Sequence, residues 1–304
     1  MNRGRRRIAQ RIICQVHRGV FVLLTSLAAA LLAAGCATLF EPLEQQFLFR
    51  ARPADPGRFA AILERDPGIE EVRLSAADGV RLHGLLKRAP AAAPGERYPL
   101  VIVFGGLARE TSWMLGWGEK PPEWGWLLVN YRGFGLSQGQ PSERALLEDA
   151  KRVYDWAAAR ADVDAASIVV LGRSLGSHVA VSLASQRAVR GAILATPFDS
   201  LAAVGEKRYP LLPVGRLANG HYDSAALAPR IGVPALFVLA QDDEVTPAEH
   251  GEALARAWGG TARVVTLNGA SHRSIVRRDE FWQAIAGFLR EMNGAAGVRS
   301  ISRR

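Results

Sequence analysis

Cysteine is almost absent from this sequence. The 304 residues contain two cysteines, Cys14 and Cys36, and both lie within the first 36 positions. Residues 37–304 therefore hold no thiol that could form a disulfide or act as a nucleophile. A covalent mechanism in that part of the chain needs another nucleophile, and serine is the candidate that the sequence offers.

Acidic residues are missing from the same N-terminal stretch, which has six arginines and no aspartate or glutamate. The whole chain carries a net charge of +9, but subtracting these arginines leaves 32 basic and 29 acidic residues, or +3, for residues 37–304. A body so near charge balance is not typical of nucleic-acid-binding proteins, and we expect no nucleic-acid partner.

Long apolar runs are also scarce. The run at residues 20–34, mostly leucine, valine and alanine, follows the arginines. It is shorter than the ~20 residues that a transmembrane helix needs. A basic segment, a short apolar core and small residues before Cys36 are typical of a secretory signal peptide, with an uncleaved anchor helix as the alternative. Because no second run is long enough to span a membrane, a polytopic membrane protein is not expected.

Residues 33–36, Ala-Ala-Gly-Cys, resemble the lipobox of bacterial lipoproteins, although alanine stands where leucine is usual. The resemblance implies cleavage before Cys36 and acylation of its sulfur, so residues 1–36 are expected to be a lipoprotein-type signal peptide. Ala37 after the cysteine implies sorting to the outer membrane. We therefore expect a lipid-anchored protein of the bacterial cell envelope, on the periplasmic face of the outer membrane. Residues 37–68, interrupted by prolines and charges, are expected to form a tether.

Short apolar runs alternate with helical patterns through residues 69–293. A hairpin is predicted at 71–86, strands at 98–104, 126–130, 168–171, 191–195, 235–240 and 263–267, and helices at 141–160, from 246 and at 280–292. This alternation is typical of an α/β fold, with a mostly parallel sheet covered by helices on both faces. Thr246 and Glu249 are expected to form a capping box at the start of their helix.

Two segments lack a clear period. Residues 199–232 contain three prolines and are expected to form a short lid over the site. Residues 294–304 are expected to be a frayed basic tail. The predicted folded domain is thus residues 69–293.

The most informative stretch is Gly172-Arg173-Ser174-Leu175-Gly176, between a predicted strand and a helix-compatible run. Strand, Gly-x-Ser-x-Gly and helix is the context of a nucleophile elbow. In such a turn the serine backbone is strained, and a side chain at either glycine would collide with its surroundings. The serine hydroxyl lies at the tip, and the N–H of Leu175 points to a developing oxyanion. A glycine-rich connection without function is the alternative.

A serine hydroxyl needs a base that takes its proton and a carboxylate that orients the base. After an elbow of this type they follow in the order serine, acid, histidine. Asp243 follows the predicted strand at 235–240, and His272 follows the strand at 263–267. Both are expected at the C-terminal edge of the sheet, where sites form in open α/β folds.

Other residues compete for both roles. Asp242 is the alternative acid, and all acids of this turn could simply be solvated. The competing histidines have less suitable places: His83 in a strand, His178 one helical turn after Ser174, His221 in the lid and His250 inside a predicted helix. A histidine held within a helix is poorly placed to act as a mobile base, which favours His272.

A second oxyanion donor is expected from the loop after strand 98–104. Gly105 and Gly106 allow the backbone to turn there, and the N–H of Leu107 is the expected donor beside that of Leu175. Glycines that serve only to reverse the chain are the alternative.

Together these pieces resemble the α/β-hydrolase superfamily of serine hydrolases, and most of all its depalmitoylase-like and serine-aminopeptidase-like branch. The resemblance covers residues 71–292 and rests on segments 104–108, 130–137, 141–143, 172–176, 196–200, 240–245 and 269–272. Segment 240–245 resembles the family pattern Gly-x-x-Asp-x-Val, which selects Asp243 over Asp242. Leu107 departs from the family, which more often has asparagine there, so a role of that side chain is not carried over.

The resemblance implies an α/β-hydrolase fold and a serine hydrolase that cleaves carboxylic ester or thioester bonds through an acyl-enzyme intermediate. It implies Ser174 as nucleophile, His272 as base and Asp243 as its partner, with no metal ion or organic cofactor. The implied substrate is a small acyl ester or thioester, and the lipid anchor implies a membrane partner. A serine-aminopeptidase-like peptidase and a non-catalytic envelope lipoprotein on a hydrolase scaffold are the alternatives.

Overall fold

The computed structural model describes residues 48–49, 53–107, 110–116, 120–209, 211, 218 and 220–301, with side chains described through residue 293. The chain divides into two units, Met1–Phe47 and Leu48–Arg304, and the second is described here. The expected signal peptide, with Cys36, and residues 37–47 and 50–52 of the expected tether lie outside the described residues. Within the described part, no helix combines the length and the hydropathy needed to cross a membrane.

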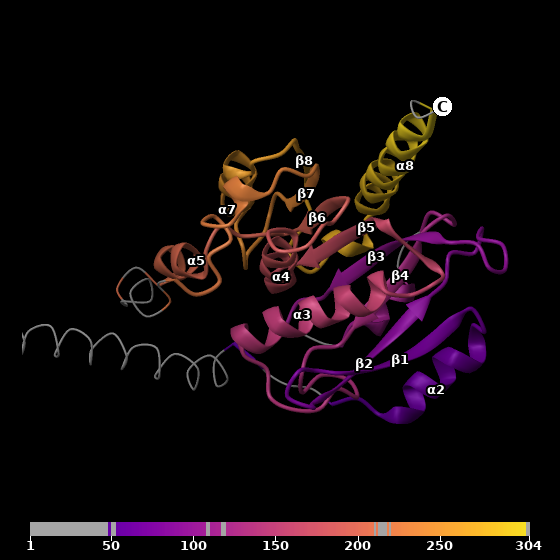
Figure 1. The fold of residues 1–304 in the computed structure, drawn as a ribbon. Coiled ribbons are helices and arrows are strands. Elements are labelled where there is room, and N and C mark those ends of the chain that lie inside the picture. Colours follow the sequence, from indigo (N-terminus) through magenta and orange to yellow (C-terminus); the bar gives the residue numbers. More distant parts are fainter. Residues whose placement is uncertain are drawn as a thin grey trace, which may run out of the picture. The chain divides into compact units, whose positions relative to one another are not determined.

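An eight-stranded sheet forms the centre of this unit (Figure 1). Its strands are β1 (Ile69–Ser75), β2 (Arg81–Lys87), β3 (Tyr98–Phe104), β4 (Gly125–Val129), β5 (Val163–Arg173), β6 (Gly191–Ala195), β7 (Ala235–Ala240) and β8 (Ala262–Leu267). Their spatial order is β1-β2-β4-β3-β5-β6-β7-β8. β2 pairs antiparallel with β1 and β4, and the other neighbours pair in parallel. The expected mostly parallel sheet is confirmed.

Helices precede, connect and follow these strands. They are α2 (Pro56–Arg65), α3 (Glu143–Ala158), α4 (Leu175–Ala184), α5 (Leu201–Arg208), α7 (Ala248–Ala257) and α8 (Asp279–Ile301), with short 3₁₀ turns η1 (Ser112–Gly116), η2 (Ala228–Arg230) and η3 (Ile275–Arg277). Figure 1 shows α3 running across the sheet. Ser142 caps the first turn of α3, because its side chain accepts a 3.3 Å hydrogen bond from the Ala145 N–H.

The central strands β3, β4, β6 and β7 are buried on both faces, which explains why they are continuous apolar runs. Val169 and Leu171 of β5 belong to a core that includes Phe281, Ile285 and Leu289 of α8. Alternate residues of the strands point the other way. On that opposite face Phe237 of β7 meets Trp258, at the end of α7, edge to face at 5.7 Å.

The segment expected to be a tether contains a packed helix. Asp55 accepts a hydrogen bond from the Gly57 N–H at the start of α2, and Pro56 occupies its first turn. Phe59 of this helix is 2% exposed and meets the ring of His83 in β2 at 4.5 Å. The folded unit therefore begins before the expected residue 69, because α2 covers apolar surface next to β2.

The structure differs from three further expectations, which concern the helices α5, α7 and α8. α7 begins at Ala248 without a side-chain cap, so the expected capping box of Thr246 and Glu249 is wrong. The Thr246 hydroxyl instead donates a 3.1 Å hydrogen bond to the carbonyl of Thr196. The expected lid contains α5, whose first turn is capped by Ser200. α8 continues through Ile301, into the segment expected to fray.

Candidate active site

The Gly-x-Ser-x-Gly stretch forms a sharp turn between β5 and α4. Ser174 has φ 53° and ψ −123°, in the region of positive φ that side chains other than glycine seldom adopt. A Cβ at Gly172 would lie 2.2 Å from the Gly176 oxygen, and one at Gly176 would lie 2.2 Å from the Phe104 oxygen. Both positions therefore require glycine, and the tight turn places Ser174 beyond the end of β5.

Asp243 and His272 form a buried pair. His272 Nδ1 lies 2.9 Å from Asp243 Oδ2 and 3.0 Å from Oδ1. The carboxylate also accepts hydrogen bonds from the N–H groups of Val245, at 2.9 Å, and Thr246, at 2.7 Å. These bonds hold the carboxylate in place, so that it can orient the imidazole.

Thr246 is a site residue that sequence reasoning missed. Its hydroxyl oxygen lies 3.2 Å from His272 Nδ1 and 3.3 Å from Asp243 Oδ2, while it donates to the Thr196 carbonyl. It thus connects the end of β6 with the acid–histidine pair. Its position three residues after Asp243 was the one sequence signal for this contact, but the Thr246 hydroxyl had been predicted to cap the following helix.

Arg173, next to Ser174, connects the elbow with the His272 loop and was also missed. Its Nη2 donates a 2.6 Å hydrogen bond to the His272 carbonyl. Within the described residues the structure shows no hydrogen bond between the Ser174 hydroxyl and His272. The structure therefore brings Asp243 and His272 into contact, and it joins Ser174 to them through the neighbouring arginine. Catalytic hydrogen bonds are often long in enzymes without substrate.

The expected oxyanion loop lies beside Ser174. A Cβ on Gly106 would be 3.4 Å from the Cβ of Ser174. The loop is fixed by a 2.9 Å hydrogen bond from the Tyr131 hydroxyl to the Gly105 carbonyl. Leu175 is the first residue of α4, and N–H groups at a helix start have no acceptor within the helix. Leu175 and Leu107, which follows Gly106, can thus present N–H groups to an anion near Ser174.

The competing residues are engaged elsewhere or exposed. Asp242 is exposed, and Glu244 accepts a 3.2 Å hydrogen bond from the His272 N–H. The other described histidines each face an acid other than Asp243: His83 Nε2 lies 3.2 Å from Glu71, His178 Nε2 3.2 Å from Glu143, His221 Nδ1 2.8 Å from Glu143, and His250 Nδ1 2.9 Å from Asp199. Among the described histidines, His272 alone contacts Asp243.

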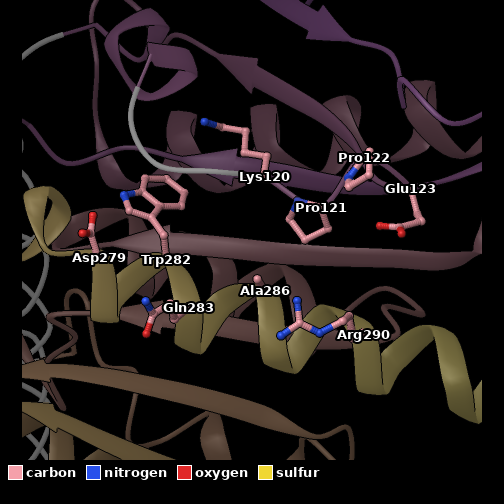
Figure 2. Close-up of a pocket in the computed structure, with 9 residues that line it drawn as sticks. All are labelled: Lys120, Pro121, Pro122, Glu123, Asp279, Trp282, Gln283, Ala286 and Arg290. Carbon is pink, nitrogen blue, oxygen red and sulfur yellow. The ribbon is translucent and has the colours of Figure 1, made fainter.

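A cavity of about 510 Å³ lies away from these residues, between α8 and the segment that precedes β4 (Figure 2). Its lining is Lys120, Pro121, Pro122, Glu123, Asp279, Trp282, Gln283, Ala286 and Arg290. Ser174, Asp243 and His272 instead follow the C-terminal ends of β5, β7 and β8. This cavity is therefore not the catalytic pocket. The described residues also hold no cluster of three or more His, Cys, Asp or Glu side chains arranged to bind a metal.

The chain is similar to a known family and to several known proteins. Residues 145–290 match the model of a family described as serine hydrolase. The protein MT2364 of Mycobacterium tuberculosis (strain CDC 1551 / Oshkosh) is 33% identical over 250 residues, covering 80% of this chain and 85% of that relative. The alpha/beta hydrolase domain-containing protein WAV2 of Arabidopsis thaliana is 27% identical over 223 residues, covering 67% and 69% of the two chains.

Solved structures share the fold. An alpha-beta hydrolase from Vibrio vulnificus superposes with a TM-score of 0.62 at 19% identity, covering 80% of this chain and 88% of that one. The acetyl xylan esterase from Paenibacillus sp. R4 gives 0.60 at 16% identity, covering 81% and 98%. Joined to the family match and the conformation of the elbow, these likenesses place the chain among the serine hydrolases of the α/β-hydrolase superfamily.

Proposed function

We propose that this protein hydrolyses carboxylic ester or thioester bonds through an acyl-enzyme intermediate. The observation that carries the proposal is the buried Asp243–His272 pair at the sheet edge that also bears the Ser174 elbow. A base oriented by a carboxylate is what a serine hydroxyl needs to become a nucleophile.

The chemistry follows from these positions. His272 Nε2 takes the proton of the Ser174 hydroxyl while the Ser174 oxygen forms a bond to the substrate carbonyl carbon. The N–H groups of Leu107 and Leu175 stabilise the oxyanion. When the tetrahedral intermediate collapses, the bond to the leaving alcohol or thiol breaks and His272 gives it the proton. Water then attacks the acyl-enzyme by the same route, which releases the acid and restores Ser174.

The contacts of Glu143 favour an ester or thioester substrate over a peptide with a free amino terminus. An aminopeptidase needs an unoccupied acid for the amino terminus of its substrate. Glu143, at the start of α3, contacts His178 and His221, and it accepts a hydrogen bond from the Tyr222 N–H. Its carboxylate is therefore already engaged by three groups of the protein, which supports a structural role.

The test compares nitrophenyl esters of increasing acyl length, acyl thioesters and aminoacyl anilides as substrates. Ser174→Ala is expected to lower kcat/KM for the esters by at least ~10⁴-fold. Ser185→Ala, at the end of the same helix, is the matched control and is expected to leave turnover unchanged. Ester hydrolysis that survives Ser174→Ala, or a preference for the anilides, would reject the proposal.

We also propose that acylation of Cys36 anchors this protein to the outer membrane, with its body in the periplasm. The support is the lipobox-like sequence at residues 33–36. The test is metabolic labelling with an alkynyl palmitate in a Gram-negative host. Label and membrane association are expected for the native chain and should disappear in Cys36→Ala, whereas label that remains in that variant would contradict the anchor.

A further inference from the structure

The mechanism above leaves one buried cation beside the site unused. Arg173 is the last residue of β5 and is 7% exposed. Its Nη2 donates a 2.6 Å hydrogen bond to the carbonyl of His272, a residue 99 positions later in the chain. Its Nη1 lies 3.3 Å from the position that a Cβ on Gly106 would take. The same guanidinium therefore touches the His272 loop and underlies the oxyanion loop.

This arginine is poorly compensated for a buried charge. An arginine side chain keeps its proton in proteins and is seldom buried without a paired acid. Arg173 makes no direct ion pair with a carboxylate among the described residues, and its Nε there has no hydrogen-bond partner. Burial lowers the pKa of Arg173, and the negative charge of Asp243 opposes that change. A buried cation of this kind is unfavourable for stability, which points to a role in the site.

His272 is held from several directions. Its ring contacts Asp243, its N–H donates to Glu244, and its carbonyl accepts from Arg173. Of these partners, Arg173 is the one that adjoins Ser174 in the chain. A shift of the His272 loop relative to the elbow would therefore have to break or bend this short hydrogen bond.

We infer that Arg173 is a positioning residue of the proposed hydrolase, whose guanidinium fixes the main chain of His272 relative to Ser174 and whose charge favours the oxyanion beside Gly106. The inference rests on the proposed function. Because the strand that carries the nucleophile also holds the main chain of the base, this side chain contributes to the distance between the two. Arg173 is buried beneath the loop, so it acts through the position of His272 and through its charge, without contact to the substrate.

The two contributions can be separated by substitution. Arg173→Met removes both the hydrogen bond and the charge, Arg173→Gln keeps an N–H donor without charge, and Arg173→Lys keeps a charged donor. Arg187→Met is the control, because it removes an arginine that pairs with Asp155 at the surface. Thermal unfolding of each variant verifies that it is folded, and if Arg173→Met does not fold, the Lys and Gln variants carry the test.

A positioning role predicts a loss in kcat rather than in substrate binding. Displacement of a catalytic group by about 1 Å lowers rates by ~10²-fold. We therefore expect Arg173→Met to lower kcat for the best nitrophenyl ester by ~100-fold with KM changed less than about threefold. Arg173→Lys should recover at least about tenfold of the loss, and Arg173→Gln less than Arg173→Lys. The control should retain the wild-type kcat.

Three results would overturn the inference. They are a wild-type kcat in folded Arg173→Met or Arg173→Gln, a raised KM at unchanged kcat, and a lysine variant no better than the glutamine variant. Ser174→Ala, assayed in parallel, distinguishes rejection of the positioning role from rejection of the proposed function. If Ser174→Ala is inactive while the Arg173 variants are unaffected, the positioning role alone is rejected. If Ser174→Ala remains active, the proposed function itself is rejected.

Discussion

His272 Nδ1 lies 2.9 Å from Asp243 Oδ2, and the Asp243 side chain is 1% exposed. A carboxylate held this close accepts a hydrogen bond from Nδ1–H, which keeps that proton on Nδ1 and leaves the lone pair of the imidazole on Nε2. Nε2 is the nitrogen that must take a proton from the Ser174 hydroxyl. The pair therefore determines both the orientation of His272 and the tautomer in which it can act as a base.

Replacing the buried acid tests this assignment. Asp243→Asn is expected to lower kcat by ~10⁴-fold, because an amide can donate to Nδ1 and thereby favour the wrong tautomer. Asp242→Asn, which changes the exposed neighbour, is the matched control and should leave kcat unchanged. Steady-state kinetics on one nitrophenyl ester measure both. Equal losses in the two variants would show that the turn as a whole, rather than Asp243, is needed.

Crowding at the elbow predicts opposite effects of two Gly→Ala substitutions. A Cβ at Gly176 would lie 2.2 Å from the Phe104 oxygen, whereas one at Gly287 in α8 would meet nothing within 4 Å. Gly176→Ala should lower the free energy of unfolding by about 1–3 kcal/mol. Gly287→Ala should raise it by up to ~1 kcal/mol, through helix propensity. Urea unfolding measures both changes, and stabilisation by Gly176→Ala would contradict the tight turn.

Arg132 predicts a large loss of stability away from the reacting groups. Its guanidinium donates two 2.8 Å hydrogen bonds to Asp149, which is buried, and also pairs with the exposed Asp78. Arg132→Met leaves Asp149 without its partner and should lower the free energy of unfolding by about 3–5 kcal/mol. Asp78→Asn removes only the exposed partner and should have a much smaller effect. Similar losses in the two variants, by urea unfolding, would contradict the burial argument.

Lys120, between α8 and β4, predicts a pH dependence of stability. Its Nζ lies 4.8 Å from the Trp282 ring and 5.6 Å from the Trp126 ring (Figure 2 shows Lys120 and Trp282). Burial, with a smaller effect of Lys87, lowers the pKa of Lys120 from 10.5 to about 8. Between these values the unfolded chain binds more protons than the folded one, so stability from this group rises with pH. Below pH 8 both states are protonated and its contribution is constant.

Lys120→Met isolates this group from others that titrate at high pH. From pH 7.5 to 9.5 the free energy of unfolding of the wild type should rise by about 2 kcal/mol relative to the variant. Urea unfolding at the two pH values provides the comparison. A wild type that changes in parallel with Lys120→Met would show that the lysine titrates normally in the folded state.

Sequence reasoning succeeded where burial leaves a simple pattern. The runs at 98–104, 191–195 and 235–240 became β3, β6 and β7 with the same bounds, because strands covered on both faces are apolar throughout. Asp243 and His272 were expected at one edge of the sheet because each follows a parallel strand, and the structure places them in contact. The choice of Asp243 over Asp242 rested on the family resemblance, and the catalytic roles stay a prediction.

The remaining features depend on contacts between distant segments. The hydrogen bond from Arg173 to His272 joins residues 99 positions apart, and no local sequence pattern predicts it. Thr246 was predicted to cap a helix. The contacts of its hydroxyl with Thr196 and His272 form only after β6, β7 and β8 assemble, so the sequence does not show them. α2 was missed because Phe59 is buried against His83 of another element. These are tertiary effects that override local propensity.

The most direct test of the account is the site of covalent modification by a fluorophosphonate. The reagent should modify the native protein once, and peptide mapping by mass spectrometry should place the adduct on Ser174. Labelling should be absent in Ser174→Ala and strongly slowed in His272→Ala, because the hydroxyl then lacks its base. An adduct on another residue, or undiminished labelling of Ser174→Ala, would contradict the central claim that Ser174 is the nucleophile.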